Sequence, residues 1–424
     1  MNTRDDCAHA LASARRFTER ITAGVADHAA ARQFDPLFSP IAWHFGHIAW
    51  QEEVWVLRRA AREPPIEPYF DAIFDSFVSP KDERALAVPP LSALRRYAAE
   101  VRERTLALLA RGTFDSQNEL LNDGYVFRFI ANHERQHAEH IGIVRLLGEV
   151  YLETPDDVLA PQPSPRRNEY VRVPGGHFVL GAESDPDAWD NESPCRTIEI
   201  ADFALQRAPV TCGDWLEFMT AGGYEDGRLW SEAGNAFRAS TGLTAPLYWS
   251  RDEHGAYHTR SLAGPCRVQP VEAVSHVSWY EAEAYARFAG ARLPSEPEWE
   301  HATSWDAAGG KRRWPWGNEA TVESANLSLR RARPSRRGEF PESALGFEDL
   351  VGGCWEWSES VFAPYPGFRP QAYRGYSEPW FDGRHRIARG GCFLTQPEIA
   401  RTTFRNWYLP EIRQVPLGLR LARF

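Results

Sequence analysis

The stretch SPIAWHFGHIAWQEEVWVLR, residues 39–58, decides the fold of the N-terminal part of this chain, together with ANHERQHAEH, residues 131–140. Apolar residues recur at intervals of three and four in both stretches, which predicts two amphipathic helices. One face of each predicted helix carries histidines, namely His44, His47, His133, His137 and His140. Two such faces can enclose one metal ion, because imidazole nitrogen suits iron, copper, zinc and nickel. A metal-dependent enzyme is therefore the leading hypothesis.

One site needs three of these histidines. His133 and His137 are one helical turn apart, so the third ligand must come from the other helix, where the spacing does not choose between His44 and His47. The letters HERQH also match the H-E-x-x-H pattern of zinc proteases, in which Glu134 would be the general base. A protease is not expected, because no third downstream ligand and no substrate-binding strand follow before the next domain.

Helical periodicity runs through the first 150 residues or so. It predicts four helices, at about 5–24, 39–63, 91–111 and 119–150. Four helices of this length joined by loops form an antiparallel bundle, and the long connection from Glu63 to Pro90 is of the kind that often carries function. The predicted organisation is a bundle at 1–153, a proline-rich linker at 154–169 and a second domain at 170–424.

The second half of the chain has a different pattern. Short β-like runs such as YVRVPGGHFVLG alternate with clusters of Gly, Pro, Asn and Asp, which predicts a mixed α+β domain. One helix is expected where Ser278 can act as the N-cap and Glu281 as the acid of a capping box. The basic run RRARPSRR, residues 330–337, is interpreted as a solvated loop.

The composition argues against several classes of protein. A formal net charge of −10 argues against nucleic-acid binding. No apolar run approaches the roughly 20 residues of a membrane helix, so no membrane partner is expected. The charged N-terminus lacks the apolar core of a secretion signal, which predicts a cytoplasmic location. The six cysteines contain no C-x-x-C pair and are expected to be reduced thiols.

Both halves of the chain resemble known families. Residues 39–58 and 131–140 resemble the N-terminal domain of the iron-dependent sulfoxide synthases of ergothioneine biosynthesis, a helical bundle of the DinB type. The second half resembles the formylglycine-generating-enzyme (sulfatase-modifying) fold, a C-type-lectin-like domain, at the landmarks YVRVPGGHFVLG, RWPWGN, FEDLVGGCWEWSES, RIARGGCFLT and LGLRLARF. The resemblance implies an α+β multidomain protein, with a DinB-like four-helix bundle followed by a C-type-lectin-like domain.

The resemblance also implies a set of metal ligands. In that family the ligands of Fe(2+) are the histidine before the I-x-x-Q-E-E run and both histidines of the H-E-x-Q-H motif. Carried over position by position, these are His47, His133 and His137. His44 then supports a ligand or the structure, and His140, which has no counterpart in the motif, packs or faces solvent.

The implied substrates are small molecules. One is hercynine, the trimethylated betaine of histidine, whose quaternary ammonium group is held by aromatic faces. The others are O2 and a chalcogen donor. In the family the F-R-N-W motif and the glutamine of H-E-x-Q-H contribute to the hercynine pocket, which implies Asn406, Trp407 and Gln136 here. A tyrosine pair three residues apart supplies a proton donor near the iron, and QAYRGYSEPWF offers Tyr373 and Tyr376.

The donor is inferred from the segment after Trp407. Sulfoxide synthases that use γ-glutamylcysteine read R-N-W-D-Y-P followed by arginines, whereas this chain has Tyr408 in place of the acid and Ile412 in place of an arginine. A site without these charges cannot pair a zwitterionic donor in the same way. The letters RNWYLPEIRQVPLGLR resemble the motif of the selenoneine synthases, which implies formation of a C–Se bond between hercynine C2 and a selenosugar.

Three alternatives stay open at this point. An ergothioneine-type sulfoxide synthase would form a C–S bond between hercynine and another thiol. A metal-binding bundle fused to a lectin-like module would bind a ligand without turnover, and bundles of this type also bind metals in thiol transferases. The cysteine-pair chemistry of formylglycine-generating enzymes is not expected, because the RGG signature is followed by Cys392 alone.

Overall fold

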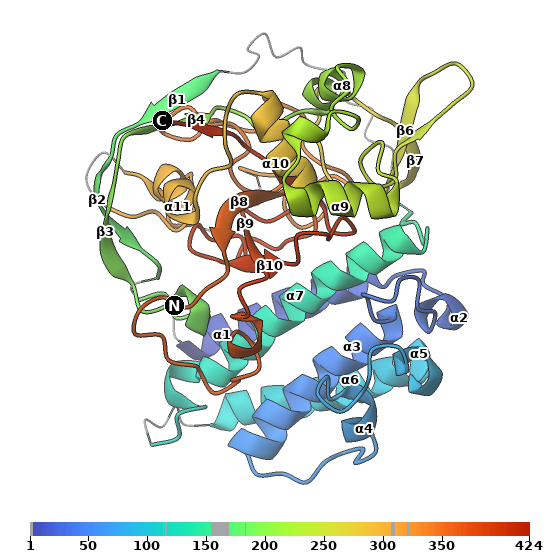
Figure 1. Cartoon of the computed structure of the whole chain (residues 1–424). Helices are drawn as coiled ribbons and strands as arrows, with labels where there is room; N and C mark the ends of the chain where they lie inside the picture. Colours follow the sequence, from blue (N-terminus) through green and yellow to red (C-terminus); the bar gives the residue numbers. More distant parts are fainter. Residues whose placement is uncertain are drawn as a thin grey trace. The chain divides into compact units, whose positions relative to one another are not determined.

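The computed structural model describes residues 3–112, 114, 117–153, 169–182, 184–306, 310–319 and 323–424. The chain divides into two compact units, Met1–Thr154 with Leu262–Gly264 and Pro155–Ser261 with Pro265–Phe424. The first unit is helical and the second combines helices and strands (Figure 1), which confirms the expected α+β multidomain fold. The predicted linker at 154–169 lies, apart from its last residue, outside the described residues.

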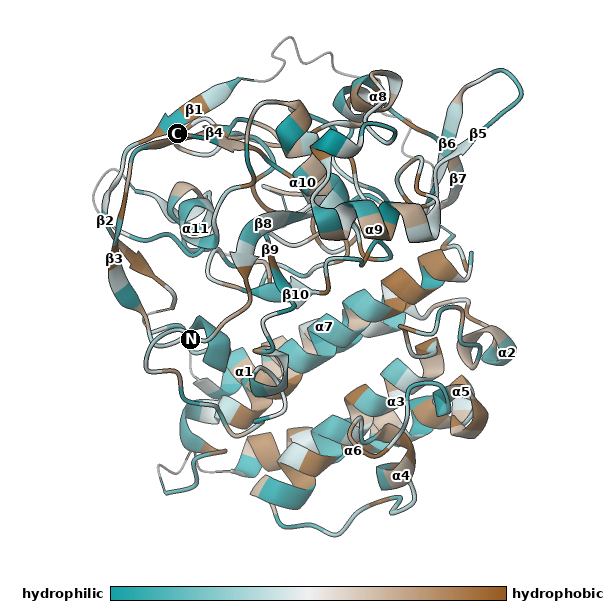
Figure 2. Ribbon diagram, viewed as in Figure 1, coloured by the Kyte–Doolittle hydropathy of each residue, from teal (hydrophilic) through white to brown (hydrophobic). Residues whose placement is uncertain are grey.

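The first unit is a bundle of four long helices. These are α1 (Thr3–Ile21), α3 (Ile41–Glu52), α6 (Leu91–Arg111) and α7 (Tyr125–Leu147). Shorter helices occupy the connections: α2 (Asp27–Ala30), α4 (Phe70–Phe74), α5 (Arg84–Ala87) and η2 (Asn122–Gly124). Helix α1 packs on α7, and α3 packs on both α6 and α7. Helices α1 and α6 bury one stripe of side chains, seen in Figure 2 as a mixture of brown and teal, whereas every residue of α3 is buried.

The four predicted helices are present with small changes at their ends. The last begins at Tyr125 rather than near residue 119, because Asp123 and Gly124 have φ values of 48° and 72° that an α-helix cannot continue through. The second changes its winding after Glu52 and continues as a π-helix, η1 (Glu53–Ala60). As a result Glu52 and Glu53 are both buried and meet different partners, and such π segments are frequent at functional sites.

The second unit contains short strands in several small sheets. The strands are β1 (Tyr170–Val173), β2 (Gly176–Leu180), β3 (Arg196–Ile200), β4 (Phe203–Gln206), β5 (Ser250–Arg251), β6 (Tyr257–Ser261), β7 (Gly264–Arg267), β8 (Trp355–Val361), β9 (Arg386–Arg389), β10 (Asn406–Tyr408), β11 (Leu417–Leu419) and β12 (Ala422–Arg423). The largest sheet has the order β10-β9-β8-β11, in which β11 runs parallel to β8 and the other pairs are antiparallel. The edge strand of this sheet, β10, carries Asn406 and Trp407, the last two residues of the F-R-N-W segment.

Helices cover these sheets. They are α8 (Cys212–Thr220), α9 (Glu232–Thr241), α10 (Trp279–Phe288) and α11 (Glu296–Ser304), with 3-10 turns η3 (Asp190–Glu192), η4 (Gly227–Leu229) and η5 (Glu378–Trp380). The capping box predicted for α10 is confirmed, since the Ser278 hydroxyl accepts from the amide of Glu281 and the Glu281 carboxylate accepts from the amide of Ser278.

Buried ion pairs join distant parts of the second unit. The pairs are Arg389 with Glu300, Arg401 with Glu192 at 2.5 Å, Arg405 with Glu296 at 2.7 Å, and Arg420 with Glu356 at 3.0 Å. All four arginines are at most 1% exposed. Burying a charge is costly unless it is paired, so these contacts constrain where each loop can lie.

The interpretation of residues 330–337 as a solvated loop is wrong in part. Arg331 is 3% exposed and contacts Glu272 at 3.2 Å, and Arg333 contacts the same carboxylate at 2.6 Å. Glu272 is itself buried, so these two arginines of the run form ion pairs inside the domain. All six cysteines are free thiols, as expected. Within the described part of the chain, no helix combines the length and the apolarity needed to cross a bilayer.

Candidate metal centre

Three histidines of the bundle converge on one point. His47 comes from α3, and His133 and His137 come from successive turns of α7. One ligand nitrogen from each lies within 4.8 Å of the other two. The ring centroids are 4.4 Å apart for His133 and His137, and 4.6 Å apart for His47 and His137. The geometry therefore allows the three imidazoles to share one ion.

Burial keeps these imidazoles neutral. Desolvation lowers the pKa of His47 to about 3 and lowers the pKa values of His133 and His137 well below the usual value. Repulsion between neighbouring histidines adds to the effect. A neutral imidazole offers a lone pair to a metal ion, so the site has the donor set of a nitrogen-ligated transition metal.

The long connection after η1 orients His47. Its Nδ1 lies 2.7 Å from the carbonyl oxygen of Phe74, which can only accept, so Nδ1 carries the proton and Nε2 is left for a metal. Trp43 stacks on the His47 ring at 4.6 Å and donates its indole N–H to the carbonyl of Ile73. The predicted functional loop thus acts on the metal centre through α4.

His44 and His140 form a second group with His137. Their ligand nitrogens also lie within 4.8 Å of one another, and Nδ1 of His44 is 2.9 Å from Nδ1 of His137. Among the described residues, His47 is the histidine that completes a group with both His133 and His137. Position in space therefore favours His47 over His44 as the third ligand, a choice that helical spacing alone left open.

Glu134 takes no part in this cluster. Its carboxylate accepts from Arg15 at 2.7 Å and from Arg102 at 2.7 Å. The same two arginines bind Glu52, at 3.2 and 2.7 Å, so four charged side chains form one buried network. A carboxylate held by two guanidinium groups is a poor general base, which agrees with the rejection of a zinc protease. The sequence reasoning missed this network, although Glu52 belongs to the Q-E-E run.

The predicted hercynine-binding residues lie in both units. Gln136 is partly buried on α7, next to His137. Asn406 and Trp407 lie on β10 of the second unit. The Trp407 ring stacks on Phe362 at 4.3 Å with an interplanar angle of 5°. Their approach to one another across the two units stays a prediction.

The predicted tyrosine pair lies in a tight turn. The amide of Tyr376 donates to the carbonyl of Tyr373 at 3.1 Å. The Tyr376 ring stacks on Trp189 at 3.8 Å and meets the edge of Trp407 at 5.4 Å. Tyr376 is thus held between two tryptophans, one of which the sequence analysis did not single out.

The turn that carries the tyrosines is anchored to η3. The hydroxyl of Ser377 donates to Asp190 at 2.5 Å and accepts from the side-chain amide of Asn191 at 3.0 Å. Ser377 is fully buried. Burial raises the pKa of Asp190, and the Ser377 hydrogen bond partly offsets this. Dense tryptophan in this half was the one signal in the sequence that could have pointed to Trp189.

Tyr408 closes β10. Its hydroxyl accepts from the side-chain amide of Asn406 at 2.9 Å. Ile412, the residue in place of an arginine, is 9% exposed. The next residue, Arg413, is paired with Glu281 at 2.9 Å and so does not replace the missing charge.

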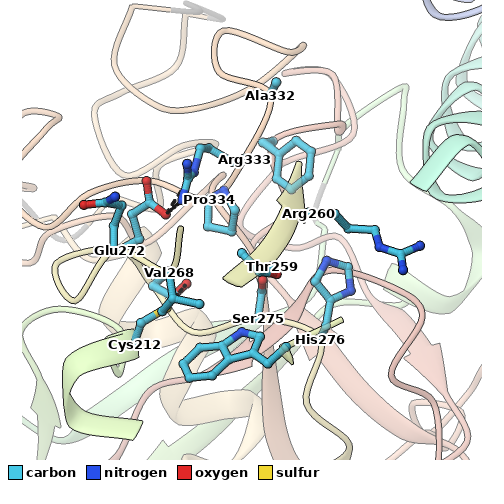
Figure 3. Close-up of a pocket in the computed structure, with 14 residues that line it drawn as sticks. Cys212, Thr259, Arg260, Val268, Glu272, Ser275, His276, Ala332, Arg333 and Pro334 are labelled. Atoms are coloured by element: carbon cyan, nitrogen blue, oxygen red, sulfur yellow. Dashed lines mark hydrogen bonds and ion pairs between the residues drawn. The ribbon is translucent and has the colours of Figure 1, made fainter. Parts of the chain in front are cut away.

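A separate pocket lies in the second unit (Figure 3). Its space is about 20 Å³, the scale of one or two water molecules. Glu272 in its wall is engaged by Arg333, and burial raises the pKa of the Cys212 thiol well above the usual value. A protonated, buried thiol is a poor nucleophile, so Cys212 is not a candidate catalytic residue in this pocket.

The fold and the histidine cluster define a DinB-type helical bundle joined to a sulfatase-modifying-factor domain. Residues 10–141 match the DinB superfamily, and residues 155–424 match the sulfatase-modifying factor enzyme 1-like domain. The chain is 40% identical over 436 residues to the hercynine oxygenase of Mycolicibacterium thermoresistibile, covering 99% of this chain and 95% of that protein.

Two further relatives match the whole chain and a part of it, respectively. The hercynine oxygenase of Mycobacterium tuberculosis is 40% identical over 439 residues and covers 100% of this chain and 99% of its own length. The formylglycine-generating enzyme of Thermomonospora curvata is 30% identical over 285 residues, covering 59% of this chain and 92% of its own. The chain belongs to the hercynine oxygenase family, a family of oxygen-dependent oxidoreductases.

Proposed function

We propose that this chain joins a chalcogen donor to C2 of the hercynine imidazole in an O2-dependent reaction on iron(II) held by His47, His133 and His137. One observation carries the proposal: these three histidines converge in a chain whose whole length matches hercynine oxygenases. Metal-binding modules without turnover and thiol transferases are disfavoured because the relatives that span the chain are named as oxygenases.

The residues fit iron(II). Three neutral nitrogen donors would hold the ion and would leave further coordination positions open for substrates. Because the Phe74 carbonyl accepts the Nδ1 proton of His47, Nε2 of His47 would hold the ion. When bound, iron(II) supplies the electrons that begin the reduction of O2 and favours the deprotonated form of the chalcogen donor.

The side chains of the second unit provide the organic binding site in this proposal. The faces of Trp407 suit the trimethylammonium group of hercynine, at about 0.5–2 kcal/mol per contact. Asn406 and Gln136 supply hydrogen bonds to the rest of the molecule. Tyr373 and Tyr376 are the candidate proton donors, and the stack between Trp189 and Tyr376 holds their turn in one conformation.

The first candidate donor is a thiol, because the chain resembles the ergothioneine-type sulfoxide synthases and its relatives of full length are named hercynine oxygenases. In that reaction the hercynine C2–H bond and the thiol S–H bond break and a C–S bond forms. One oxygen atom of O2 enters the sulfoxide and the other leaves as water. The two hydrogens released from carbon and sulfur balance that water.

A selenosugar is the second candidate donor, and one observation favours it. Tyr408 and Ile412 replace the charged residues expected for a zwitterionic thiol, and the neighbouring Arg413 is already paired with Glu281. A neutral sugar needs hydroxyl partners and aromatic faces, which Tyr408 and Asn406 can offer. The product would then contain a C–Se bond.

A donor competition tests both proposals. The enzyme, iron(II) and hercynine are incubated in air with γ-glutamylcysteine, cysteine and selenoglucose, while oxygen uptake is followed and the products are weighed. Uptake that requires hercynine and a donor together supports the proposed function, and the mass of the product identifies the donor. If no pair of substrates stimulates uptake by the iron-loaded protein, the proposed function is wrong.

A further inference from the structure

His44 lies beside the proposed metal ligands without being one of them. It is 5% exposed, and its Nδ1 is 2.9 Å from Nδ1 of His137. Its Nε2 is buried and has no hydrogen-bond partner within the part of the chain that the structure describes. Among the described residues, the contact with His137 is therefore the one side-chain hydrogen bond of His44, and the role of His44 is inferred from this contact.

We infer that His44 positions His137 for metal binding by accepting a hydrogen bond from its Nδ1–H. The inference rests on the ligand set of the proposed function. A neutral imidazole has one N–H donor and one lone pair. When Nε2 of His137 gives its lone pair to a metal ion, its proton must lie on Nδ1, and Nδ1 of His44 is the acceptor in reach.

The hydrogen bond from His137 to His44 resembles the one from His47 to Phe74, but its acceptor is a side chain and not a backbone carbonyl. His47 donates its Nδ1–H to a backbone carbonyl, whose direction is fixed by the chain. His137 meets a side chain that can either donate or accept, so its tautomer is set only when an ion takes Nε2. The hydrogen bond then fixes the plane of the His137 ring and raises its basicity as a ligand.

A second ion at His44, His137 and His140 is the competing explanation for the close contact. Two features of the structure oppose it. The guanidinium of Arg84 lies 3.8 Å from the ring of Trp43, whose edge meets His44 at 5.5 Å. Lys81 binds the carbonyl of Leu37, next to Phe38, whose ring meets that of His140. The same positive charges would repel a second divalent cation. The second group would also need His137, which the first site already uses.

Four variants separate these explanations. His44→Phe keeps the volume of the ring and removes the acceptor. His44→Asn places an amide oxygen near the position of Nδ1, whereas His44→Gln carries its amide one carbon further out and cannot match it. His140→Phe is the matched control, because His140 lies 5.6 Å from the His137 ring with no hydrogen bond to it in the described structure.

Iron(II) affinity is measured without substrates and without oxygen, by competition with a chelator, and the ligand field is read from the visible spectrum of the Co(II)-loaded protein. We expect His44→Phe and His44→Gln to weaken iron(II) binding by about 10-fold to 100-fold and to shift the Co(II) spectrum. His44→Asn should stay within about threefold of the wild type and keep its spectrum. His140→Phe should change neither.

Several results would overturn the inference. Wild-type affinity in His44→Phe, or failure of His44→Asn to restore binding, would show that the acceptor is not needed. Equal losses in His140→Phe and His44→Phe, or two ions per chain, would show a second metal site instead. Failure of the proposed function looks different: the iron-loaded wild type would then show no oxygen uptake with any pair of substrates, while the effect of His44→Phe on iron(II) affinity would remain. Iron(II) binding that persists after His47 and His133 are both replaced by alanine would instead refute the ligand set on which the inference rests.

Discussion

His47, His133 and His137 lie on two long helices, whereas Tyr376 and Trp407 lie on a turn and on a three-residue strand of the second unit. On α7 the spacing of the ligands follows from helical geometry within five residues. In the second unit the positions of the aromatic residues are set by side-chain contacts between residues far apart in sequence, such as Ser377 with Asp190. A metal centre of the first kind can be read from local periodicity, and an aromatic site of the second kind cannot.

Removing one helix-borne ligand should have the largest effect. With His133→Ala, two imidazoles remain, so we expect iron binding to be lost and turnover to fall below detection. Metal analysis of the purified protein and oxygen uptake measure the two losses. Full iron content together with full activity would refute the ligand assignment. His140→Phe serves as the control for a histidine on the same helix.

Breaking one long-range ion pair should damage the second unit while leaving the metal centre intact. Arg405→Leu leaves the buried Glu296 with only the more distant Arg389, 3.9 Å away, which should lower the free energy of unfolding by up to about 3–5 kcal/mol. Denaturant unfolding of the second unit, followed by tryptophan fluorescence, measures the change. Iron(II) affinity should stay within about twofold of the wild type. A large loss of iron(II) affinity in this variant would show that metal binding by the first unit depends on this ion pair of the second unit.

Asp349 of the second unit is a buried carboxyl group without an ion-pair partner of its own among the described residues. Burial raises the pKa of Asp349 to about 8, and attraction to Arg420 only partly opposes this. Arg420 is instead paired with Glu356. Since an unfolded aspartate loses its proton near pH 3.9, the folded state holds the extra proton between about pH 4 and pH 8. Stability should therefore fall as the pH rises through this window.

Asp349→Asn tests that pH dependence. Asparagine has no proton to lose, and it tolerates the positive φ of 48° at this position. The wild type should lose at most about 1.4 kcal/mol of unfolding free energy per pH unit between pH 5 and pH 7 beyond any slope seen in the variant. Identical slopes in the two proteins would show that Asp349 is ionised in the folded state.

The smallest effect is expected at the donor site. Tyr408→Asp introduces the acid found in the γ-glutamylcysteine type, so we expect kcat/KM for a sugar donor to fall by about tenfold relative to a zwitterionic thiol. Tyr408→Phe is the control that removes only the hydroxyl bonded to Asn406. An unchanged donor preference in Tyr408→Asp would show that this position does not select the substrate.

The histidine helices and the capping box of α10 were predictable because each depends on neighbours within one or two turns. The sequence did not predict the π-helical winding after Glu52 or the contacts of Glu52 and Glu53, because their partners Arg102 and Tyr97 lie roughly fifty residues away. Trp189 was missed for the same reason, because its partner Tyr376 is nearly two hundred residues further along the chain.

For the basic run at 330–337 the sequence led to a prediction that was wrong in part, and not to a missed feature. A cluster of arginines was interpreted as solvated because charged residues are seldom buried singly. The sequence gives no local sign that Glu272 lies beneath Arg331 and Arg333, so their burial could not be inferred without the fold.

The hydrogen bond between His47 and the carbonyl of Phe74 has a thermodynamic consequence. The segment between η1 and α6 helps to set the tautomer of His47, a proposed ligand. If the ordered segment strengthens metal binding, a bound metal ion stabilises the ordered segment by the same free energy. Limited proteolysis near Phe74 would then report metal occupancy: cleavage should become slower as the iron(II) concentration rises, even in the absence of organic substrates.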